Sequence, residues 1–239
     1  MMLKAMEPLG LALKDFYSGK KRAKVIFYRD DGLKSELLIR TFFRTSNYFS
    51  NLEKQALELC KGKILDIGAG VGPHSLELQK IGLEVHALDI SPQACEIMKQ
   101  QGVKHVHCSN IYDLDLDSFD TILLLGRSIG FVENLNGMKK FLNYCKTLLN
   151  PSGIILFDSI DIRATKEKIH LDYHERNRKF GRYIGEIGCQ IKYKGKLGEK
   201  FQLLYIDPDT LKECAQKVGL LCKILYKEEN GNYLANIFT

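Results

Sequence analysis

The sequence predicts an α/β fold with a doubly wound, seven-stranded sheet that is parallel except for an antiparallel hairpin near its C-terminal end. Short apolar runs alternate with helix-like stretches between residues 63 and 157, as in the βαβ units of parallel sheets. The dipeptide Asn230-Gly231 separates two further β-like runs, which favours a hairpin. A length of 239 residues suits one such domain together with a cap.

The residues before this alternation, 1–59, form the first predicted domain. Apolar and aromatic side chains recur at helical spacing towards its end, which predicts a helical cap or lid. Residues 60–239 form the second predicted domain. Its first part is expected to contain strands at 63–67, 84–89, 103–108, 119–125 and 154–157 and helices at 74–81, 92–101 and 135–149. The sequence Asn150-Pro151-Ser152-Gly153 predicts a turn before the fifth strand.

An insertion at 159–206 interrupts the alternation. A charged stretch at 164–178 predicts a helix, and two β-like runs at 183–193 and 200–206 predict an antiparallel hairpin. We expect this insertion and the N-terminal segment to cover the open edge of the sheet, where an acceptor pocket should lie. A helix at 207–218 and strands at 220–227 and 233–238 are then expected to complete the chain.

The composition is that of a globular protein. Hydrophobic residues make up 45% and charged residues 27%, and seven scattered cysteines fit a reducing compartment. No apolar run is long enough to span a bilayer, and charges interrupt the N-terminal stretch, so we expect a cytoplasmic protein without a membrane partner. The net charge of +6 and the basic runs at 20–24 and 176–182 permit an anionic partner or a nucleic acid but identify neither.

The most informative motif is a glycine-rich segment between the first strand and the first helix of the second domain. It reads Asp66-Ile67-Gly68-Ala69-Gly70-Val71-Gly72. Glycines there let the backbone turn sharply and approach a ligand closely, and the helix that follows presents free N–H groups. Asp89 ends the next strand, where a carboxylate can accept both hydroxyls of a ribose. Together these features predict a site for a nucleoside-containing cofactor.

The motif resembles that of class I S-adenosylmethionine-dependent methyltransferases, D/E-x-G-x-G-x-G, with every defined position present. The resemblance continues through 89–92, 109–111 and 150–153, and it covers roughly residues 60–158 and the final hairpin. It implies a Rossmann-like sheet and S-adenosylmethionine as the cofactor. A dinucleotide fingerprint would place glycine or alanine at position 73, and Pro73 therefore argues against a nicotinamide oxidoreductase.

The resemblance also implies which residues bind the cofactor. In this sequence they are Asp66, Gly68, Ala69, Gly70, Gly72, Asp89, Ile90, Asn110, Ile111 and Gly126. By position, Asp66 and the Gly68 carbonyl would face the methionine ammonium, Asp89 would hold the ribose, and residues 90, 110 and 111 would contact adenine. The family often has Asp where this chain has Asn110, and an ordinary turn role for Asn110 is the alternative.

The acceptor side carries no fixed signature, because methyl transfer from a sulfonium mainly requires alignment and exclusion of water. The catalytic candidates are Arg127 and Ser128 after the fourth strand and Asp158 at the end of the fifth. Loop and helix-capping roles are the alternatives for Ser128 and Asp158. We predict no metal ion, because His170 and His174 lie on a charged helix of a kind that is usually solvated.

The expected function is methyl transfer to a nitrogen or oxygen atom of a small-molecule acceptor. The [D/N]-P-P-[Y/F] motif of amino-directed nucleic-acid methyltransferases is absent, and the segment 126–131 resembles small-molecule enzymes. An RNA or protein methyltransferase, supported by the two basic runs, is the first alternative. A regulatory or interaction protein that binds S-adenosylmethionine without turnover is the second.

Overall fold

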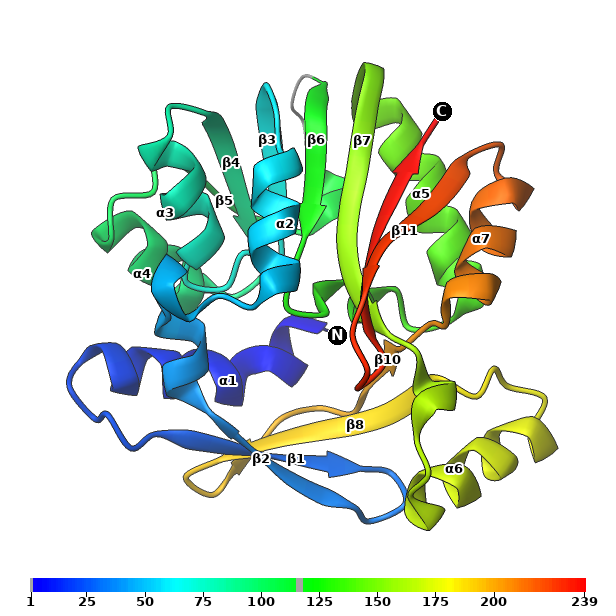
Figure 1. The fold of residues 1–239 in the computed structure, drawn as a ribbon. Helices are drawn as coiled ribbons and strands as arrows, with labels where there is room; N and C mark the ends of the chain where they lie inside the picture. The colour runs from blue at the N-terminus through cyan, green and yellow to red at the C-terminus, as the bar shows by residue number, and fades with distance from the viewer. Residues whose placement is uncertain (1, 115–117) are drawn as a thin grey trace. The chain divides into compact units, whose positions relative to one another are not determined.

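The computed structural model describes residues 2–114 and 118–239 and contains two sheets with flanking helices (Figure 1). The chain divides into two compact units. One comprises Met1–Leu116 and Gly188–Phe201, and the other comprises Asp117–Ile187 and Gln202–Thr239. No helix among the described residues has the length and apolar character needed to cross a membrane.

The larger sheet has seven strands in the order β11-β12-β7-β6-β3-β4-β5. The pairs β3–β4, β4–β5 and β6–β7 are parallel, whereas β12 is antiparallel to both β7 and β11. The predicted fold class is therefore confirmed. The strands are β3 (Lys63–Ile67), β4 (Glu84–Asp89), β5 (His105–Cys108), β6 (Phe119–Leu124), β7 (Leu149–Ile160), β11 (Leu221–Lys227) and β12 (Asn232–Phe238).

The second sheet follows the order β10-β8-β1-β2, with β9 paired to β8. The two β-like runs of the insertion do form strands, but they do not form an isolated hairpin, because β8 also pairs antiparallel with β1 from Ile26↔Lys192 to Arg29↔Cys189. The N-terminal segment is thus a mixture of helices and strands rather than a wholly helical cap. The strands are β1 (Lys24–Arg29), β2 (Lys34–Leu38), β8 (Glu186–Tyr193), β9 (Lys196–Leu197) and β10 (Phe201–Leu204).

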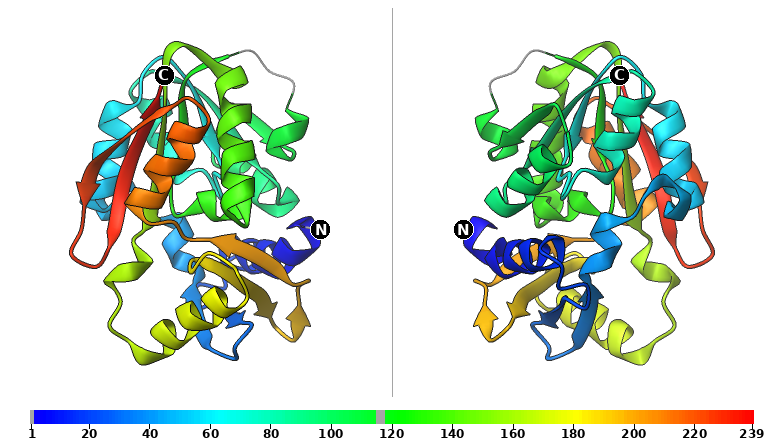
Figure 2. Two further views of the ribbon diagram at one scale, coloured as in Figure 1. Left: turned by 90° about the vertical axis from the view of Figure 1, so that its right-hand side faces the viewer. Right: turned by 90° about the vertical axis from the view of Figure 1, so that its left-hand side faces the viewer.

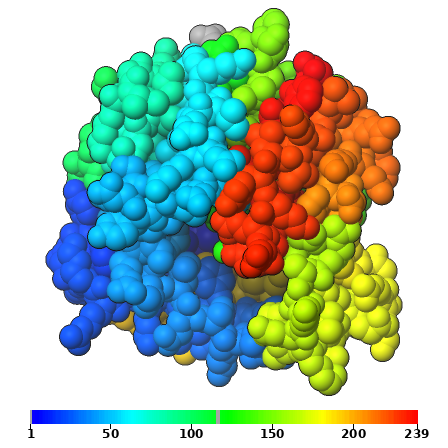
Figure 3. All heavy atoms as spheres, in the orientation of Figure 1, coloured from blue at the N-terminus to red at the C-terminus, as the bar shows by residue number. Residues whose placement is uncertain are grey.

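The helices of the first unit flank β3, β4 and β5 and extend into the N-terminal segment. A capping box starts α2, because Ser50 Oγ accepts from the Glu53 N–H and the Glu53 carboxylate accepts from the Ser50 N–H. Figure 3 shows α2 at the surface, in cyan. The α-helices are α1 (Met2–Tyr17), α2 (Asn51–Leu59), α3 (Pro73–Lys80) and α4 (Pro92–Gln100), and the 3-10 helices are η1 (Ile39–Phe43), η2 (Ser46–Tyr48) and η3 (Ile111–Asp113).

The helices of the second unit include the pair α5 and α7, which lie side by side (Figure 2), and α7 packs against the β11–β12 hairpin. Asn134 and Asp207 cap their N-termini through side-chain oxygens. His174, expected on a solvated helix, is instead 7% exposed. The helices are η4 (Ser128–Val132), α5 (Leu135–Leu148), η5 (Ile162–Ala164), α6 (Lys168–Lys179) and α7 (Pro208–Lys217).

The predicted turn at 150–153 is wrong, because these residues lie inside β7. The pairing register between β6 and β7 shifts after Phe119, and Ser152 has a positive φ of 64°. A Cβ on Gly153 would come within 2.9 Å of the Asn150 carbonyl oxygen. Proline and glycine thus mark an irregular start of a long strand here rather than a break before it.

Candidate functional site

The glycine-rich segment forms a tight corner between β3 and α3. Gly68, Gly70 and Gly72 have φ values of 71°, 59° and 81°, in the left-handed region that side chains disfavour. The N–H groups of Gly68 and Ala69 both donate to the Leu88 carbonyl, at 2.8 and 3.1 Å. The corner is therefore fixed to the end of β4 by backbone hydrogen bonds.

Asp89, the last residue of β4, is bound to the same corner. One carboxylate oxygen, Oδ2, accepts from the Gly70 N–H at 2.9 Å, and the other, Oδ1, accepts from the Ser91 N–H at 2.8 Å. Burial raises the pKa of Asp89 to about 6, although these two hydrogen bonds act to lower it. The structure thus brings together the two signals that the sequence singled out, the glycine motif and the acid.

Asp66 lies beneath the corner at the end of β3 and is 1% exposed. Ser75 Oγ donates to its Oδ2 at 2.6 Å. Burial raises the pKa of Asp66, while the nearby His74 and the Ser75 hydrogen bond act against this shift. A buried carboxyl group with so few partners is suited to a cationic ligand group.

The predicted adenine contacts lie after β4 and β5. Ile90 is half-buried and Ile111 is 5% exposed, so both offer apolar surface close to the strand ends. Asn110 is exposed, and its Oδ1 accepts from the Tyr112 N–H at 3.0 Å, which caps η3. The turn role considered for Asn110 is therefore present in the structure, and its contact with adenine stays a prediction.

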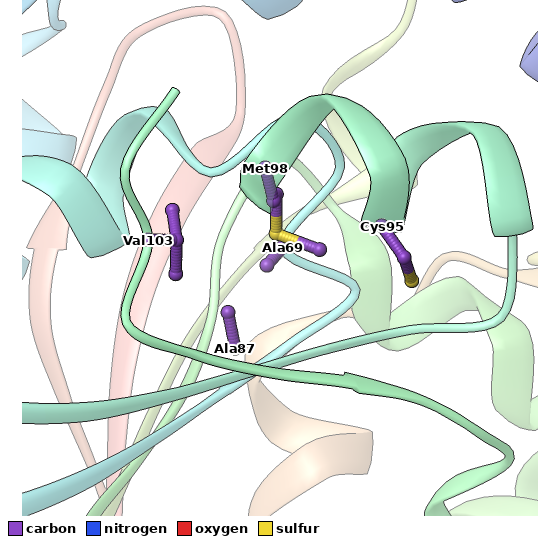
Figure 4. Close-up of a cluster of buried hydrophobic side chains, with 5 residues drawn as sticks. All are labelled: Ala69, Ala87, Cys95, Met98 and Val103. Atoms are coloured by element: carbon purple, nitrogen blue, oxygen red, sulfur yellow. The ribbon is translucent and has the colours of Figure 1, made fainter. Parts of the chain in front are cut away.

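Gly72 has a packing role that the motif alone does not reveal. A Cβ at this position would lie 2.9 Å from Val103 Cγ2 and 3.1 Å from Met98 Cγ. Both side chains belong to a buried cluster next to the corner, with Ala69, Ala87 and Cys95 (Figure 4). The third glycine of the motif therefore lets the corner pack closely against Met98 of α4 and against Val103.

A buried ion-pair network connects the N-terminal segment to the corner. The Glu53 carboxylate, 6% exposed, accepts two N–H bonds from Arg44 at 2.8 and 3.1 Å and lies 2.9 Å from His74 Nε2. Phe42 packs against the corner, since its Cδ1 lies 3.6 Å from where a Cβ on Gly70 would be. Sequence analysis missed Glu53 and His74, although the Ser50-x-x-Glu53 spacing of a capping box was a usable signal.

This network should make stability depend on acid pH. Burial acts to raise the pKa of Glu53, but hydrogen bonds from His74, Ser50 and Arg44 outweigh it and lower the pKa to about 2. Because the folded-state pKa lies below the ordinary value, the stabilisation is present above about pH 4.5 and is lost as the pH falls towards 2. Glu53→Gln should cost about 1–3 kcal/mol at neutral pH and flatten this acid-side decline.

Thermal unfolding between pH 7 and pH 3 measures both effects. Glu58→Gln, an exposed site on the same helix, is the matched control and should follow the wild type. An unchanged acid-side decline in Glu53→Gln would show that the carboxylate does not carry this pH dependence.

The loop after β6 holds the acceptor-side candidates. Gly126 and Arg127 both have positive φ values, 71° and 61°. Asp158, 8% exposed, accepts from the Arg127 N–H through Oδ1 at 2.8 Å, so the two residues meet through the backbone and not through the guanidinium. Ser128 is half-buried and opens η4.

Comparison with known proteins gives a match to a family model over part of the chain and a match to a solved structure over nearly all of it. Residues 65–157 match a family model described as a methyltransferase domain. A crystal structure of a SAM-dependent methyltransferase from Bacteroides fragilis in complex with S-adenosyl-L-homocysteine is 34% identical and has a TM-score of 0.86. That match covers 98% of this chain and 95% of that one.

Two curated relatives match over shorter ranges. A ubiquinone biosynthesis O-methyltransferase of Haemophilus ducreyi is 25% identical over an alignment of 125 residues, and the match covers 47% of this chain and 51% of that protein. A glycine/sarcosine N-methyltransferase of Halorhodospira halochloris is 28% identical over an alignment of 104 residues, and the match covers 40% of this chain and 39% of that protein. The chain thus spans about half or less of the length of these curated relatives.

Proposed function

Because this chain belongs to the family of S-adenosylmethionine-dependent methyltransferases, we propose that it transfers the methyl group of S-adenosylmethionine to a nitrogen or oxygen atom of a small molecule. The names of two relatives, an O-methyltransferase of ubiquinone biosynthesis and a glycine/sarcosine N-methyltransferase, support this class of acceptor. The absence of the [D/N]-P-P-[Y/F] motif in the sequence supports it as well.

The observation that carries the proposal is the pair of hydrogen bonds that join Asp89 to the glycine corner. Each Asp89 oxygen accepts one backbone N–H, and an ionised carboxylate oxygen can accept a second hydrogen bond. The two oxygens are thus oriented to receive the two hydroxyls of a ribose. The buried Asp66 carboxyl fits the cationic methionine ammonium, and the apolar surface of Ile90 and Ile111 fits an adenine ring.

For methyl transfer, the protein mainly has to align the acceptor atom with the methyl group of the cofactor. The sulfonium of the bound cofactor supplies an electrophilic methyl group. Asp89 and the corner would fix the adenosyl part, while Arg127 and Ser128 would orient the acceptor. An acceptor that is already unprotonated needs no general base. Asp158, which holds the Arg127 backbone, would then act by positioning that residue.

The experiment is a transfer assay that separates acceptors by size. The protein is incubated with methyl-labelled S-adenosylmethionine and a cell lysate, and the products are divided into an ultrafiltrate and an acid-precipitable fraction. We expect the label in the ultrafiltrate, and S-adenosylhomocysteine should suppress it by competing for the cofactor site. Label in precipitated RNA or protein would favour a macromolecular acceptor. Cofactor binding without any transfer would favour a regulatory protein.

A further inference from the structure

Arg127 has a strained backbone conformation. Its φ and ψ angles are 61° and 26°, in the left-handed region, where a residue with a Cβ loses about 1–2 kcal/mol. Glu133, at the other end of η4, also has a positive φ, of 70°. Strain of this kind persists where the surrounding structure enforces it, and it gathers at sites that bind ligands. The segment 127–133 is therefore a candidate for a ligand-binding site that requires this backbone conformation.

The surroundings of this segment hold it from several sides. Asp158 Oδ1 accepts the Arg127 N–H at 2.8 Å, and the Arg127 carbonyl accepts the Gly130 N–H at 3.1 Å. At the far end, Val132 and Gly137 of α5 approach so closely that a Cβ on Gly137 would lie 1.8 Å from the Val132 carbonyl oxygen. The Arg127 backbone is therefore fixed before any ligand arrives.

The Arg127 guanidinium is exposed, and residues 2–114 and 118–239 provide it with no ion pair or hydrogen bond. This differs from Arg163 in the same unit, whose guanidinium binds Asp161, Asp207 and Asp209. A guanidinium presents its N–H groups in a planar fork that matches a carboxylate or a phosphate. A fixed backbone also lowers the entropy lost when that fork engages an anion.

We propose that Arg127 binds an anionic group of the methyl acceptor, so that the acceptors are small acids with a nitrogen or oxygen nucleophile elsewhere in the molecule. This inference rests on the proposed methyltransferase function. In the transfer, the sulfur–methyl bond breaks as the new bond to nitrogen or oxygen forms. Sulfur keeps the bonding electron pair, S-adenosylhomocysteine leaves, and the acceptor atom releases its proton to water. The anionic group bound by Arg127 is not altered, and the product retains its negative charge.

The test uses the charge of the methylated products. Wild-type protein is incubated with labelled S-adenosylmethionine and a small-molecule ultrafiltrate of a cell lysate, and the products are passed over an anion exchanger. Most of the label should be retained, and phosphatase treatment before the column separates phosphates from carboxylates. Arg127→Gln should reduce the retained label by about 10–100-fold at dilute ultrafiltrate, the loss expected for a hydrogen bond to a charged group. Concentrated ultrafiltrate should restore much of it, because the defect is in acceptor binding.

Further variants separate recognition from folding and from base catalysis. Arg127→Gly tolerates the positive φ, so it should keep the wild-type unfolding temperature and lose the retained label. Lys179→Gln, which removes an exposed charge from α6, is the control and should match the wild type. Asp158→Asn keeps an oxygen that can accept the Arg127 N–H, so it should retain activity, whereas Asp158→Ala should behave like Arg127→Gln.

The possible results test acid specificity, the role of Asp158 and methyl transfer itself separately. Label that passes through the exchanger, or retained label that survives Arg127→Gln, overturns the proposed acid specificity while leaving methyl transfer intact. Equal inactivity of Asp158→Asn and Asp158→Ala would assign Asp158 to base catalysis instead of positioning. Absence of label in the ultrafiltrate with wild-type protein would refute the proposed function itself, and this inference with it.

Discussion

Replacing Asp89 with alanine should weaken binding of S-adenosylmethionine by about 100-fold or more, because two hydrogen bonds to a charged acceptor are lost together. The change also leaves the N–H groups of Gly70 and Ser91 without the carboxylate that now accepts from them. Isothermal titration measures the effect directly. The wild type should bind S-adenosylmethionine in the micromolar range and NAD little if at all.

The charge of Asp89 adds a pH dependence to this prediction. Its pKa of about 6 lies above the ordinary value, so the native state holds this proton more tightly than the unfolded chain does. Any stability that Asp89 contributes is therefore greatest in acid and declines as the pH rises through about 6. Cofactor affinity should instead increase as the pH rises through about 6, because the ionised carboxylate can then accept hydrogen bonds from the ribose hydroxyls.

Asp113→Ala, an exposed site at the end of η3, is the control for the titration and should bind like the wild type. Undiminished affinity in Asp89→Ala would place the nucleoside elsewhere. Tight binding of NAD by the wild type would reverse the assignment of the cofactor.

Gly72→Ala should lower the free energy of unfolding by about 2–5 kcal/mol, because it combines a backbone cost with overpacking of a buried cluster. The new Cβ would require a backbone angle of 81° that disfavours alanine, and it would press on Val103 and Met98. Chemical denaturation measures the loss, and cofactor affinity should fall with it because the corner would have to move.

Gly82→Ala is the matched control. Gly82 has a φ of 88°, but no atom lies within 4 Å of where its Cβ would be, so only the backbone cost of about 1–2 kcal/mol applies. The difference between the two variants isolates the packing contribution. If both lost the same stability, the flexible Met98 side chain would have made room, and close packing would not explain the glycine.

The strands of the larger sheet could be predicted because buried strands leave short apolar runs in the sequence. β6 ends in the apolar run 122–124 and β7 contains another at 154–157, as strands covered on both faces should. The cofactor corner could be predicted for a related reason. Asp66, the glycines and Asp89 owe their positions to local strand–turn–helix geometry, which short-range motifs specify.

What the sequence did not predict depends on contacts between distant parts of the chain. β1 is mostly half-buried and so lacks a clear alternation, and its partner β8 lies far along the sequence. The dipeptide Asp31-Gly32 is typical of a turn, but a turn alone does not identify the strands that it joins. The contact between Glu53 and His74 likewise exists only after the N-terminal segment has packed beside α3.

The order of strands in the second unit has a consequence for folding during synthesis. β12 lies between β7 and β11, although it is the last of the three to be made. While the nascent chain grows, β7 therefore has an open edge that β11 cannot cover. Such an edge can pair with strands of other chains, so this interval is when a chaperone would protect the emerging protein most effectively.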